Sequence, residues 1–305
     1  MNQKTKPGVE PTRARAAASI SPTRAPTVLA PLDGSVQAIA ALATARVLAE
    51  LEQATLHVVH VGEPLLPPDE LLQSLGLTRD QLRGSVIAQA GGAPAASIVR
   101  LASEWRSRLI VMCTRTRIAE PEGRLGSVAA AVVREAPCPV VLIRPELGSG
   151  PRSLRRIVVP YDGTPTTAAA LQPAMDLAGR SGAEVEVLHV VAPSAGHPPE
   201  AGSLTVPQYL DQPHHEWPVW TREFLARTWG PYDSPPAVRS RLFLRTGEPG
   251  AEIVRFAGER QSDLIVLAWR GELDGERATT LRAVIRNAPC PTIILRVTAA
   301  AARAD

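Results

Sequence analysis

Short apolar runs alternate with longer amphipathic stretches along both halves of the chain, a pattern typical of parallel strands joined by crossover helices. The runs are apolar on both faces, as expected for strands that helices cover on both sides. Residues 36–52 have the apolar spacing of such a helix. The pattern predicts an α/β fold of two doubly wound units. Their strands are expected at residues 27–32, 55–61, 85–90, 108–113 and 139–143, and at 156–161, 184–191, 240–246, 263–268 and 292–297.

The two halves repeat the same blocks of sequence in the same order. The order indicates a tandem duplication, with domains at residues 27–146 and 155–298 and a Gly/Ser/Pro-rich linker at 147–154. The matched blocks are Pro-x-Asp-Gly-Ser/Thr (31–35 and 160–164), Leu-His-Val-Val (56–59 and 188–191), Ile-Val-Arg (98–100 and 253–255), Leu-Ile-Val (109–111 and 264–266) and Ala-Pro-Cys-Pro (136–139 and 288–291).

Charge is distributed unevenly between the N-terminal tail and the rest of the chain. The 305 residues include 33 basic and 30 acidic side chains, a formal net charge of +3. Residues 1–26 hold five of the basic side chains and one of the acidic ones, so the remainder is close to neutral. We expect residues 1–26 and 299–305 to be disordered tails, because they offer little apolar surface to bury. Specific nucleic-acid binding is not expected, since it would need a basic patch on the folded part.

The sequence also indicates a compartment. No apolar stretch of about 18 residues could span a bilayer, and no apolar segment follows the N-terminal charges as in a secretory signal. Cys113, Cys138 and Cys290 are too few and too scattered for a disulfide framework or a Cys-x-x-Cys metal site. We therefore predict a cytoplasmic protein without a membrane contact or a metal site.

Candidate ligand residues follow the strands at which a doubly wound sheet reverses direction. Asp33 and Asp162 stand after the first strand of each half, each before a glycine and a hydroxyl residue. Such a carboxylate can accept from an adenine amino group or a ribose hydroxyl, or it can cap the next helix. Gly126 and Ser127 open an Ala/Val-rich helix, where free N–H groups suit a phosphate, although Ser127 also fits an ordinary cap. The sequence leaves both roles open at both places.

Taken together, these blocks make residues 27–297 resemble two universal stress protein domains in tandem. The resemblance implies a fold like that of the adenine nucleotide alpha hydrolases, with two five-stranded parallel sheets of strand order 3-2-1-4-5. Members of the family often dimerise through the last strand. The resemblance therefore implies that the two halves form an intramolecular pseudo-dimer, and it allows a homodimer of the chain. It identifies no protein partner.

ATP-binding members of the family carry Gly-x-x-Gly, nine residues, and then Gly with Ser or Thr, because the glycines let the backbone approach the phosphates. The first half keeps the nine-residue spacing and Gly126-Ser127 but has Cys113 and Thr116 at the first two glycines. The second half has a shorter loop that ends in Ala278-Thr279. The resemblance implies a site at Pro31, Asp33, Ser35, Val58, Met112, Thr114, Arg115, Gly126, Ser127 and Val128. It implies a weaker second site at Asp162, Val190, Arg270, Gly271 and Thr279.

Charge and size favour the first of these two sites. Loop 113–126 carries a net charge of +1 and loop 268–279 a net charge of −1, so a polyphosphate should prefer the first half. Trp269 stands at the second site, where it would crowd a nucleotide or stack on its base. The resemblance implies a stress-response regulatory or protective module that is not an enzyme, and the charges lead us to expect ATP or another adenine nucleotide in its first half.

Two alternatives stay open at this stage. One is a slow hydrolase of ATP or another nucleotide, with Asp33 or Ser127 placing water and metal near the phosphates. The other is an interaction scaffold that binds no nucleotide. Mg is expected only where ATP is bound, and the sequence indicates no catalytic residue.

The remaining features have simple interpretations. An insertion at 193–238 holds six of the chain's aromatic residues, and those at 217, 220 and 224 share one helical face that packs on a domain or forms a lid over the second site. The residues at 214–216 lack zinc-site spacing and indicate a solvated loop. His57 and His189, at matched positions, are predicted to be core residues. Cys113 replaces a glycine and is a candidate redox-sensitive thiol, whereas Cys138 and Cys290 are predicted to be buried.

Overall fold

The computed structural model describes residues 25–82, 84–114, 125–148, 153–191, 238–270 and 278–297. The two predicted disordered tails, the aromatic insertion and the loops that carry Arg115 and Gly271 lie outside these ranges, apart from residues at their edges. All five strands predicted in each half are present, each within two residues of its predicted ends. Buried parallel strands are recognisable from sequence because both of their faces are apolar.

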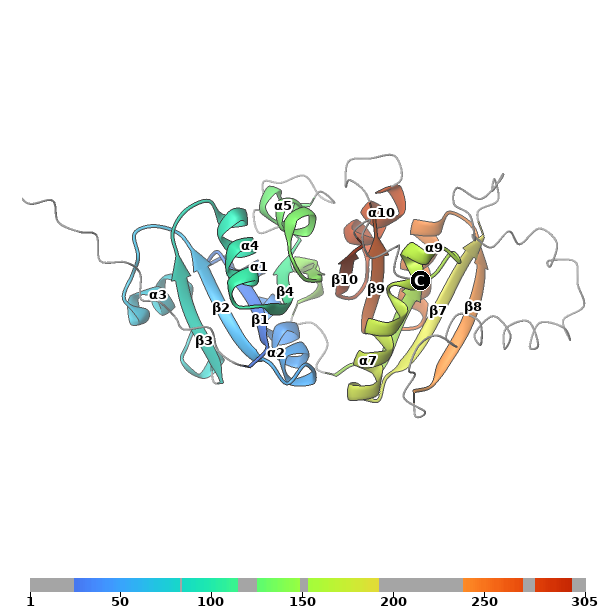
Figure 1. Cartoon of the computed structure of the whole chain (residues 1–305), viewed down its shortest axis with the longest axis horizontal. Helices are drawn as coiled ribbons and strands as arrows, with labels where there is room; N and C mark the ends of the chain where they lie inside the picture. Colours follow the sequence, from blue (N-terminus) through green and yellow to red (C-terminus); the bar gives the residue numbers. More distant parts are fainter. Residues whose placement is uncertain are drawn as a thin grey trace, which may run out of the picture.

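The strands of the described residues form one sheet with the order β3-β2-β1-β4-β5-β10-β9-β6-β7-β8 (Figure 1). Pairing within each half is parallel, and the halves meet where β5 pairs with β10. The strand bounds are β1 Thr27–Leu32, β2 Thr55–Val61, β3 Ser85–Ala90, β4 Ser107–Cys113, β5 Val140–Ile143, β6 Arg156–Pro160, β7 Glu184–Val191, β8 Ser240–Thr246, β9 Leu264–Trp269 and β10 Thr292–Arg296.

Helices cover both faces of this sheet, so each half is doubly wound (Figure 1). The predicted helix over residues 36–52 is present but is interrupted at Ala40, whose backbone stays in the right-handed helical region. One face carries α1 Val36–Ile39, α2 Ala41–Leu51, α3 Pro68–Ser74, α6 Pro165–Ala168 and α7 Leu171–Ser181. The other carries α4 Pro94–Glu104, α5 Ser127–Glu135, α9 Pro249–Glu259 and α10 Thr279–Asn287.

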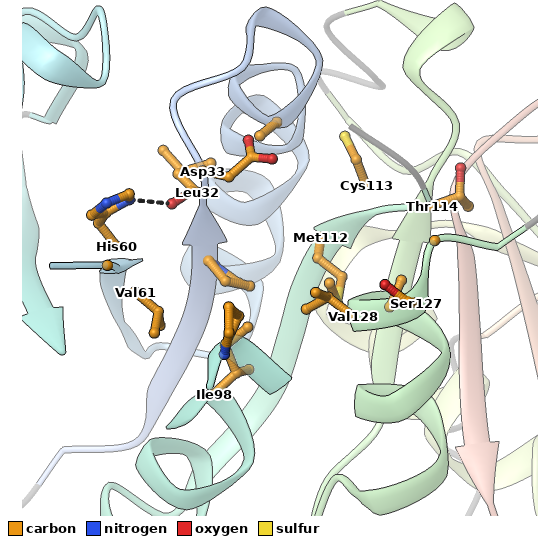
Figure 2. A pocket seen from close by; sticks show the side chains of 16 residues that line it. Leu32, Asp33, His60, Val61, Ile98, Met112, Cys113, Thr114, Ser127 and Val128 are labelled. Carbon is orange, nitrogen blue, oxygen red and sulfur yellow. Dashed lines mark hydrogen bonds between the residues drawn. The ribbon is translucent and has the colours of Figure 1, made fainter. Parts of the chain in front are cut away.

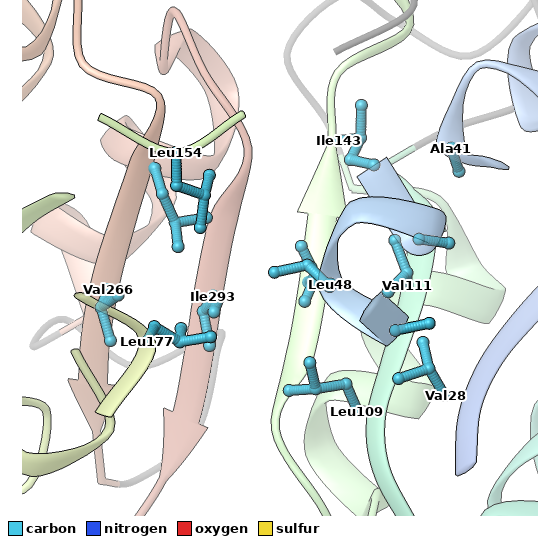
Figure 3. Packing of buried hydrophobic residues seen from close by; sticks show 14 of the residues in the cluster. Val28, Ala41, Leu48, Leu109, Val111, Ile143, Leu154, Leu177, Val266 and Ile293 are labelled. Atoms are coloured by element: carbon cyan, nitrogen blue, oxygen red, sulfur yellow. The ribbon is translucent and has the colours of Figure 1, made fainter. Parts of the chain in front are cut away.

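The hydrophobic core on each face runs through both halves. Figure 3 shows one of these cores, with Val28 and Leu48 of the first half and Leu177 and Val266 of the second. Leu154, the last residue of the predicted linker, is 4% exposed and belongs to the same core. The predicted linker therefore ends in a residue that packs in the core.

The β5–β10 pairing is antiparallel and relates the two halves symmetrically. Val141 lies opposite Ile293, and these residues hold equivalent places after the repeated Ala-Pro-Cys-Pro block. A pair of equivalent residues facing each other is the signature of an isologous contact, here between two copies in one chain.

Two arginines extend this symmetry beyond the strands. Arg144, directly after β5, donates from Nη1 to the carbonyl of Ala288 at the end of α10, at 3.1 Å. Its counterpart Arg296, at the end of β10, donates to the carbonyl of Arg134 in the last turn of α5. Each half thus places a cation against the C-terminal end of the other half's last helix, where the helix dipole favours positive charge.

Strand register shows which residues of the two halves are equivalent. Pro31 of β1 lies opposite Val59 of β2, and Pro160 of β6 lies opposite Leu188 of β7. Both prolines begin the same Pro-x-Asp-Gly block, so Val59 and Leu188 hold equivalent positions. The sequence match of residues 56–59 with 188–191 is therefore wrong by three residues, because the pairing with the first strand sets the register.

The corrected register makes His60, and not His57, the counterpart of His189. Nδ1 of His60 lies 2.9 Å from the carbonyl oxygen of Leu32, and Nδ1 of His189 lies 2.8 Å from that of Tyr161. A carbonyl oxygen only accepts hydrogen bonds, so Nδ1 carries the proton in both rings. The same tautomer is therefore fixed at the end of the second strand of each half.

His57 corresponds instead to Glu186, and the two halves use different chemistry at this place. His57 is 1% exposed, and its ring centroid lies 4.8 Å from that of Trp105, which follows α4. Glu186 is 0% exposed and accepts from Nε of Arg260, which follows α9, at 2.9 Å. The first half therefore buries an aromatic pair where the second buries an ion pair. The prediction that His57 and His189 are core residues is confirmed.

Candidate functional site

A cavity of about 450 Å³ lies in the first half at the carboxyl ends of β1, β2 and β4 (Figure 2). Since α1 and α2 lie on the opposite face from α4 and α5, the winding direction reverses between β1 and β4, and ligands of such sheets bind at this place. The cavity is lined by Pro31, Leu32, Asp33, Ala38, His60, Val61, Gly62, Pro94, Ile98, Met112, Cys113, Thr114, Gly126, Ser127, Val128 and Ala129.

The turn after β1 presents a carboxylate to this cavity. Oδ1 of Asp33 accepts from the backbone N–H of Ser35 at 3.0 Å and from its hydroxyl at 2.6 Å. Gly34 joins them with φ of +84°, a conformation that favours glycine. Ser35 in turn caps α1 by accepting from the N–H of Ala38 at 3.1 Å. Asp33 therefore both supports the cap and lines the cavity, whereas Ser35 serves as the cap and is not among the lining residues.

A helix N-terminus forms the opposite wall. The N–H of Thr114 donates to the carbonyl of Ile143 at 2.9 Å, and the N–H of Gly126 donates to the carbonyl of Thr114 at 2.7 Å. These bonds fix the start of α5 beside the end of β4. Gly126 is the N-cap and supplies no side-chain bond, so its cap leaves the first N–H groups of α5 directed at the cavity end. The hydroxyls of Thr114 and Ser127 lie at the same wall. This wall is suited to an anion.

The third wall comes from the end of β2 and the loop behind it. His60, Val61 and Gly62 line the cavity here. Gln89 of β3 holds the loop, since its Nε2 donates to the carbonyls of Gly62 at 3.2 Å and Pro64 at 3.0 Å. Its Oε1 also accepts from the N–H of residue 66 at 2.8 Å. Sequence reasoning missed Gln89 and His60, because neither lies beside a repeated glycine block.

The structure brings together seven of the ten residues that the resemblance implied for the first site. These are Pro31, Asp33, Met112, Thr114, Gly126, Ser127 and Val128. Arg115 lies outside the described residues. Val58 is 0% exposed and packs in the core on the face of α1 and α2, so it does not line the cavity. Val61, the equivalent of Val190 in the corrected register, takes its place. The error follows directly from the three-residue register shift.

The cysteine at the cavity wall is not a reactive thiol. Cys113 is 4% exposed, and its Sγ donates to the carbonyl of Gln37 at 2.7 Å. Burial, with the nearby Asp33 charge as a smaller cause, raises the pKa of Cys113 to about 12. The thiolate is the reactive form of cysteine, so the prediction of a redox-sensitive thiol is wrong. Cys290 is buried as predicted, whereas Cys138 is partly exposed.

The second half places its candidate residues differently. Oδ1 of Asp162 accepts from the N–H of Thr164 at 2.9 Å, as the cap geometry of the first half would suggest. Trp269, the last residue of β9, is 7% exposed. Val190 is the second-last residue of β7 and is partly exposed. Arg270 and Thr279 are exposed, and Gly271 lies outside the described residues. Of the charged and aromatic residues predicted at this second site, Asp162 and Arg270 are thus exposed and Trp269 is buried.

Among the described residues, no group of three or more His, Cys, Asp or Glu side chains is arranged to hold a metal ion. None of the helices in this part of the chain is long and apolar enough to cross a membrane.

Fold and cavity together define a tandem, doubly wound α/β protein with a cavity at the switch point of its first half. The sequence model of the universal stress protein family matches residues 25–144 and 153–296, one copy in each half. The chain therefore belongs to the universal stress protein family.

Individual relatives agree with this assignment. A universal stress protein of Thermus aquaticus is 36% identical over 136 residues, which span 39% of this chain and 98% of that protein. One from Methanocaldococcus jannaschii is 29% identical over 153 residues, 48% of this chain and 85% of that protein. The crystal structure of one from Archaeoglobus fulgidus has a TM-score of 0.61 at 17% identity and covers 90% of this chain and 99% of that one. The last likeness supports the fold.

Proposed function

We propose that the first half of this universal stress protein binds an adenine nucleotide and that the protein acts as a non-catalytic stress-response module. The observation that carries the proposal is one cavity that joins an apolar region, a carboxylate and a helix N-terminus. The apolar region is formed by Pro31, Val61, Ile98 and Met112. Such walls suit the faces of a purine, since ligand sites are mostly apolar with a few placed polar groups.

The polar groups match the rest of a nucleotide. Asp33 supplies acceptor oxygens for ribose hydroxyls or an amino group, because an ionised carboxylate only accepts. The start of α5, with Ser127 and Thr114, supplies donors for a phosphate. Val61 and Ile98 lie across the cavity from Thr114 and Ser127, whereas Met112 lies on the side of Ser127 and Val128 (Figure 2). When ATP is the ligand, Mg would accompany its phosphates and would be held mainly by them.

Roles already taken by the titratable lining residues argue against catalysis. Asp33 holds the α1 cap, His60 is bonded to the Leu32 carbonyl, and burial keeps the Cys113 thiol protonated. Among the described lining residues each titratable group thus also has a structural task, which favours a binding module over a hydrolase.

The same proposal covers the organisation of the chain. We place the domains at residues 27–146 and 155–298 and treat them as an intramolecular pseudo-dimer, which the antiparallel β5–β10 contact supports. Three free cysteines fit the reducing cytoplasm as its location.

Isothermal titration of the full chain with AMP and ATP tests the proposal. Asp33→Asn should weaken binding about tenfold, because a hydrogen bond to a charged group contributes about 1.5 kcal/mol or more. Asp162→Asn is the matched control, with the same change at the equivalent turn of the second half, and should leave the affinity unchanged. Wild-type protein that gives no heat with either nucleotide would favour the scaffold alternative. Equal effects of the two substitutions would also contradict the proposed site.

Mass spectrometry of the purified, denatured protein separates the remaining classes. Retained AMP or ATP supports a binder. ADP that accumulates during incubation with ATP would show hydrolysis and overturn the non-catalytic assignment.

A further inference from the structure

We propose that the indole of Trp269 fills the second half's copy of the ligand cavity, so that the chain holds one ligand and carries a latent second site for a flat bicyclic molecule. The ligand count rests on the proposed function of the first half. The filling of the second site rests only on the geometry of the two halves.

The first step is the equivalence of Trp269 and Thr114. The N–H of Ile110 donates to the carbonyl of Pro139 at 3.1 Å, and the N–H of Ile265 donates to that of Pro291 at 3.0 Å. The two prolines end the repeated Ala-Pro-Cys-Pro blocks, so the two isoleucines hold equivalent places in β4 and β9. Four residues further along each strand stand Thr114 and Trp269. Thr114 lines the first cavity.

The second step is the direction of the indole. Side chains two residues apart on a strand point to the same face. Met112 and Thr114 both line the first cavity. Their counterparts Leu267 and Trp269 are 6% and 7% exposed and belong to the core under α9 and α10. The indole therefore lies on the cavity side of the sheet, buried among apolar side chains.

Other positions around the second half's copy of the cavity also carry larger side chains. Six further lining positions exchange a smaller residue for a larger one, whereas Cys113 is exchanged for the smaller Ala268, so less free volume is left at the same place in the fold. The exchanges to a larger residue are Leu32 to Tyr161, Ala38 to Thr167, Gly62 to Val191, Gly126 to Ala278, Ser127 to Thr279 and Ala129 to Leu281. Two of the counterparts at the start of α10 are buried, with Ala278 0% and Leu281 4% exposed.

The carboxylate of Asp162 is bonded within its own turn. Oδ1 of Asp162 is bonded to the hydroxyl of Thr164 at 2.7 Å and to the hydroxyl of Thr167 at 2.6 Å. Ala38, the counterpart of Thr167, has no hydroxyl, so the first half lacks this additional donor. Oδ1 of the second carboxylate is thus engaged by its own turn, and a ligand would have to displace a hydroxyl to bond to this oxygen.

An indole and a purine are both flat, fused two-ring systems. Leu267, Leu281 and Ile253 belong to the same buried core as Trp269 and are the counterparts of Met112, Ala129 and Ile98, which line the first cavity. Removing the indole should leave a space beside them, and engineered apolar cavities of this type bind small aromatic molecules. We therefore expect the opened second site to take indole itself, and to take AMP where the α10 start supplies donors to its phosphate.

Reciprocal substitutions in the full chain test this inference by the number of AMP molecules bound in isothermal titration. Wild-type protein should bind one. Thr114→Trp should bind none, because it places the second-half residue in the first cavity. This variant should fold, because the cavity has space for the indole. Trp269→Thr should bind two, and the double variant one. Trp105→Ala is the matched control, since it removes another buried indole from the far end of α4 and should leave one site.

The outcomes separate this inference from the proposed function. A folded Trp269→Thr protein that binds one AMP, or a Thr114→Trp protein that binds AMP as wild type does, overturns the inference and leaves the first site standing. Wild-type protein without AMP binding and Trp269→Thr protein with one AMP would overturn the proposed function alone.

Indole provides a readout that does not depend on nucleotide binding or on full stability of the variant. Because ligands stabilise the state that binds them, indole at millimolar concentration should raise the Tm of Trp269→Thr and leave that of wild type unchanged. Trp269→Phe, which keeps an aromatic plug, should bind one AMP and show no indole effect. A Trp269→Thr protein whose Tm does not respond to indole contradicts a cavity at this position.

Discussion

Equivalent residues of the two halves have taken on different tasks while the backbone around them stayed the same. Thr114 lines an open cavity where Trp269 is buried, and His57 packs on an aromatic ring where Glu186 forms an ion pair. Burying a histidine costs free energy when its ring nitrogens lack hydrogen-bond partners. Within the described residues neither ring nitrogen of His57 has a hydrogen-bond partner, so its neutral form is strongly favoured.

This burial makes stability depend on pH. Burial lowers the pKa of His57 below its ordinary value of 6.5. As the pH falls below 6.5, the unfolded chain takes up a proton that the folded chain refuses, so the free energy of unfolding falls by up to about 1.4 kcal/mol per pH unit until the folded pKa is reached. His57→Phe should therefore lose less stability than wild type between pH 7 and pH 5 in urea unfolding. An unchanged pH dependence would contradict a neutral, buried His57.

The ends of α4 and α9 are attached to the sheet by different kinds of contact. Trp105 and Arg260 both follow the helix after the third strand, and each reaches back to the second strand of its half. Arg260 also lies over the ring of Phe243, 5.2 Å from its centroid. One helix end is thus tied to the sheet by aromatic contact, and the other is tied by charge and a cation–π contact.

Exchanging the pairs tests whether the two solutions are interchangeable. Arg260→Ala should destabilise the protein by about 3 kcal/mol, because it leaves the Glu186 carboxylate buried without its partner. The double variant Glu186→His with Arg260→Trp copies the pair of the first half and should lose much less than the sum of its two single changes. A double-mutant cycle in urea measures this coupling. Additive losses would show that the surrounding strands had adapted to only one pair.

At the scale of the whole molecule, the two halves share their cores and one interface. Glu52 at the end of α2 pairs with Arg108 of its own half at 3.0 Å and also with Arg180 of α7 in the other half. With the β5–β10 contact and the reciprocal arginines at α5 and α10, this joins the halves on both faces of the sheet. The first half is therefore held in place by a copy of itself whose cavity we propose to be filled.

Local sequence predicts elements here better than it predicts the site. The strands were recognisable because each is an apolar run, and helix starts followed from the Asp-Gly-Ser/Thr blocks. The register of β2 was not recognisable from the sequence. This strand contains both His57 and His60, and the Leu-His-Val-Val sequence around His57 gave the wrong match with the second half. The error replaced one cavity-lining residue, Val61, with Val58, three positions away. Gln89 and the unreactive Cys113 depend on contacts between distant strands, which a local pattern does not contain.

A crystal structure of the full chain grown with saturating AMP tests the central claim most directly. The account predicts one nucleotide per chain, with its base against Met112 and Ile98, its ribose near Asp33 and its phosphate at the start of α5. The second half should show the indole of Trp269 in the equivalent place. Nucleotide density in the second half, or a first cavity without nucleotide at saturating AMP, would contradict it.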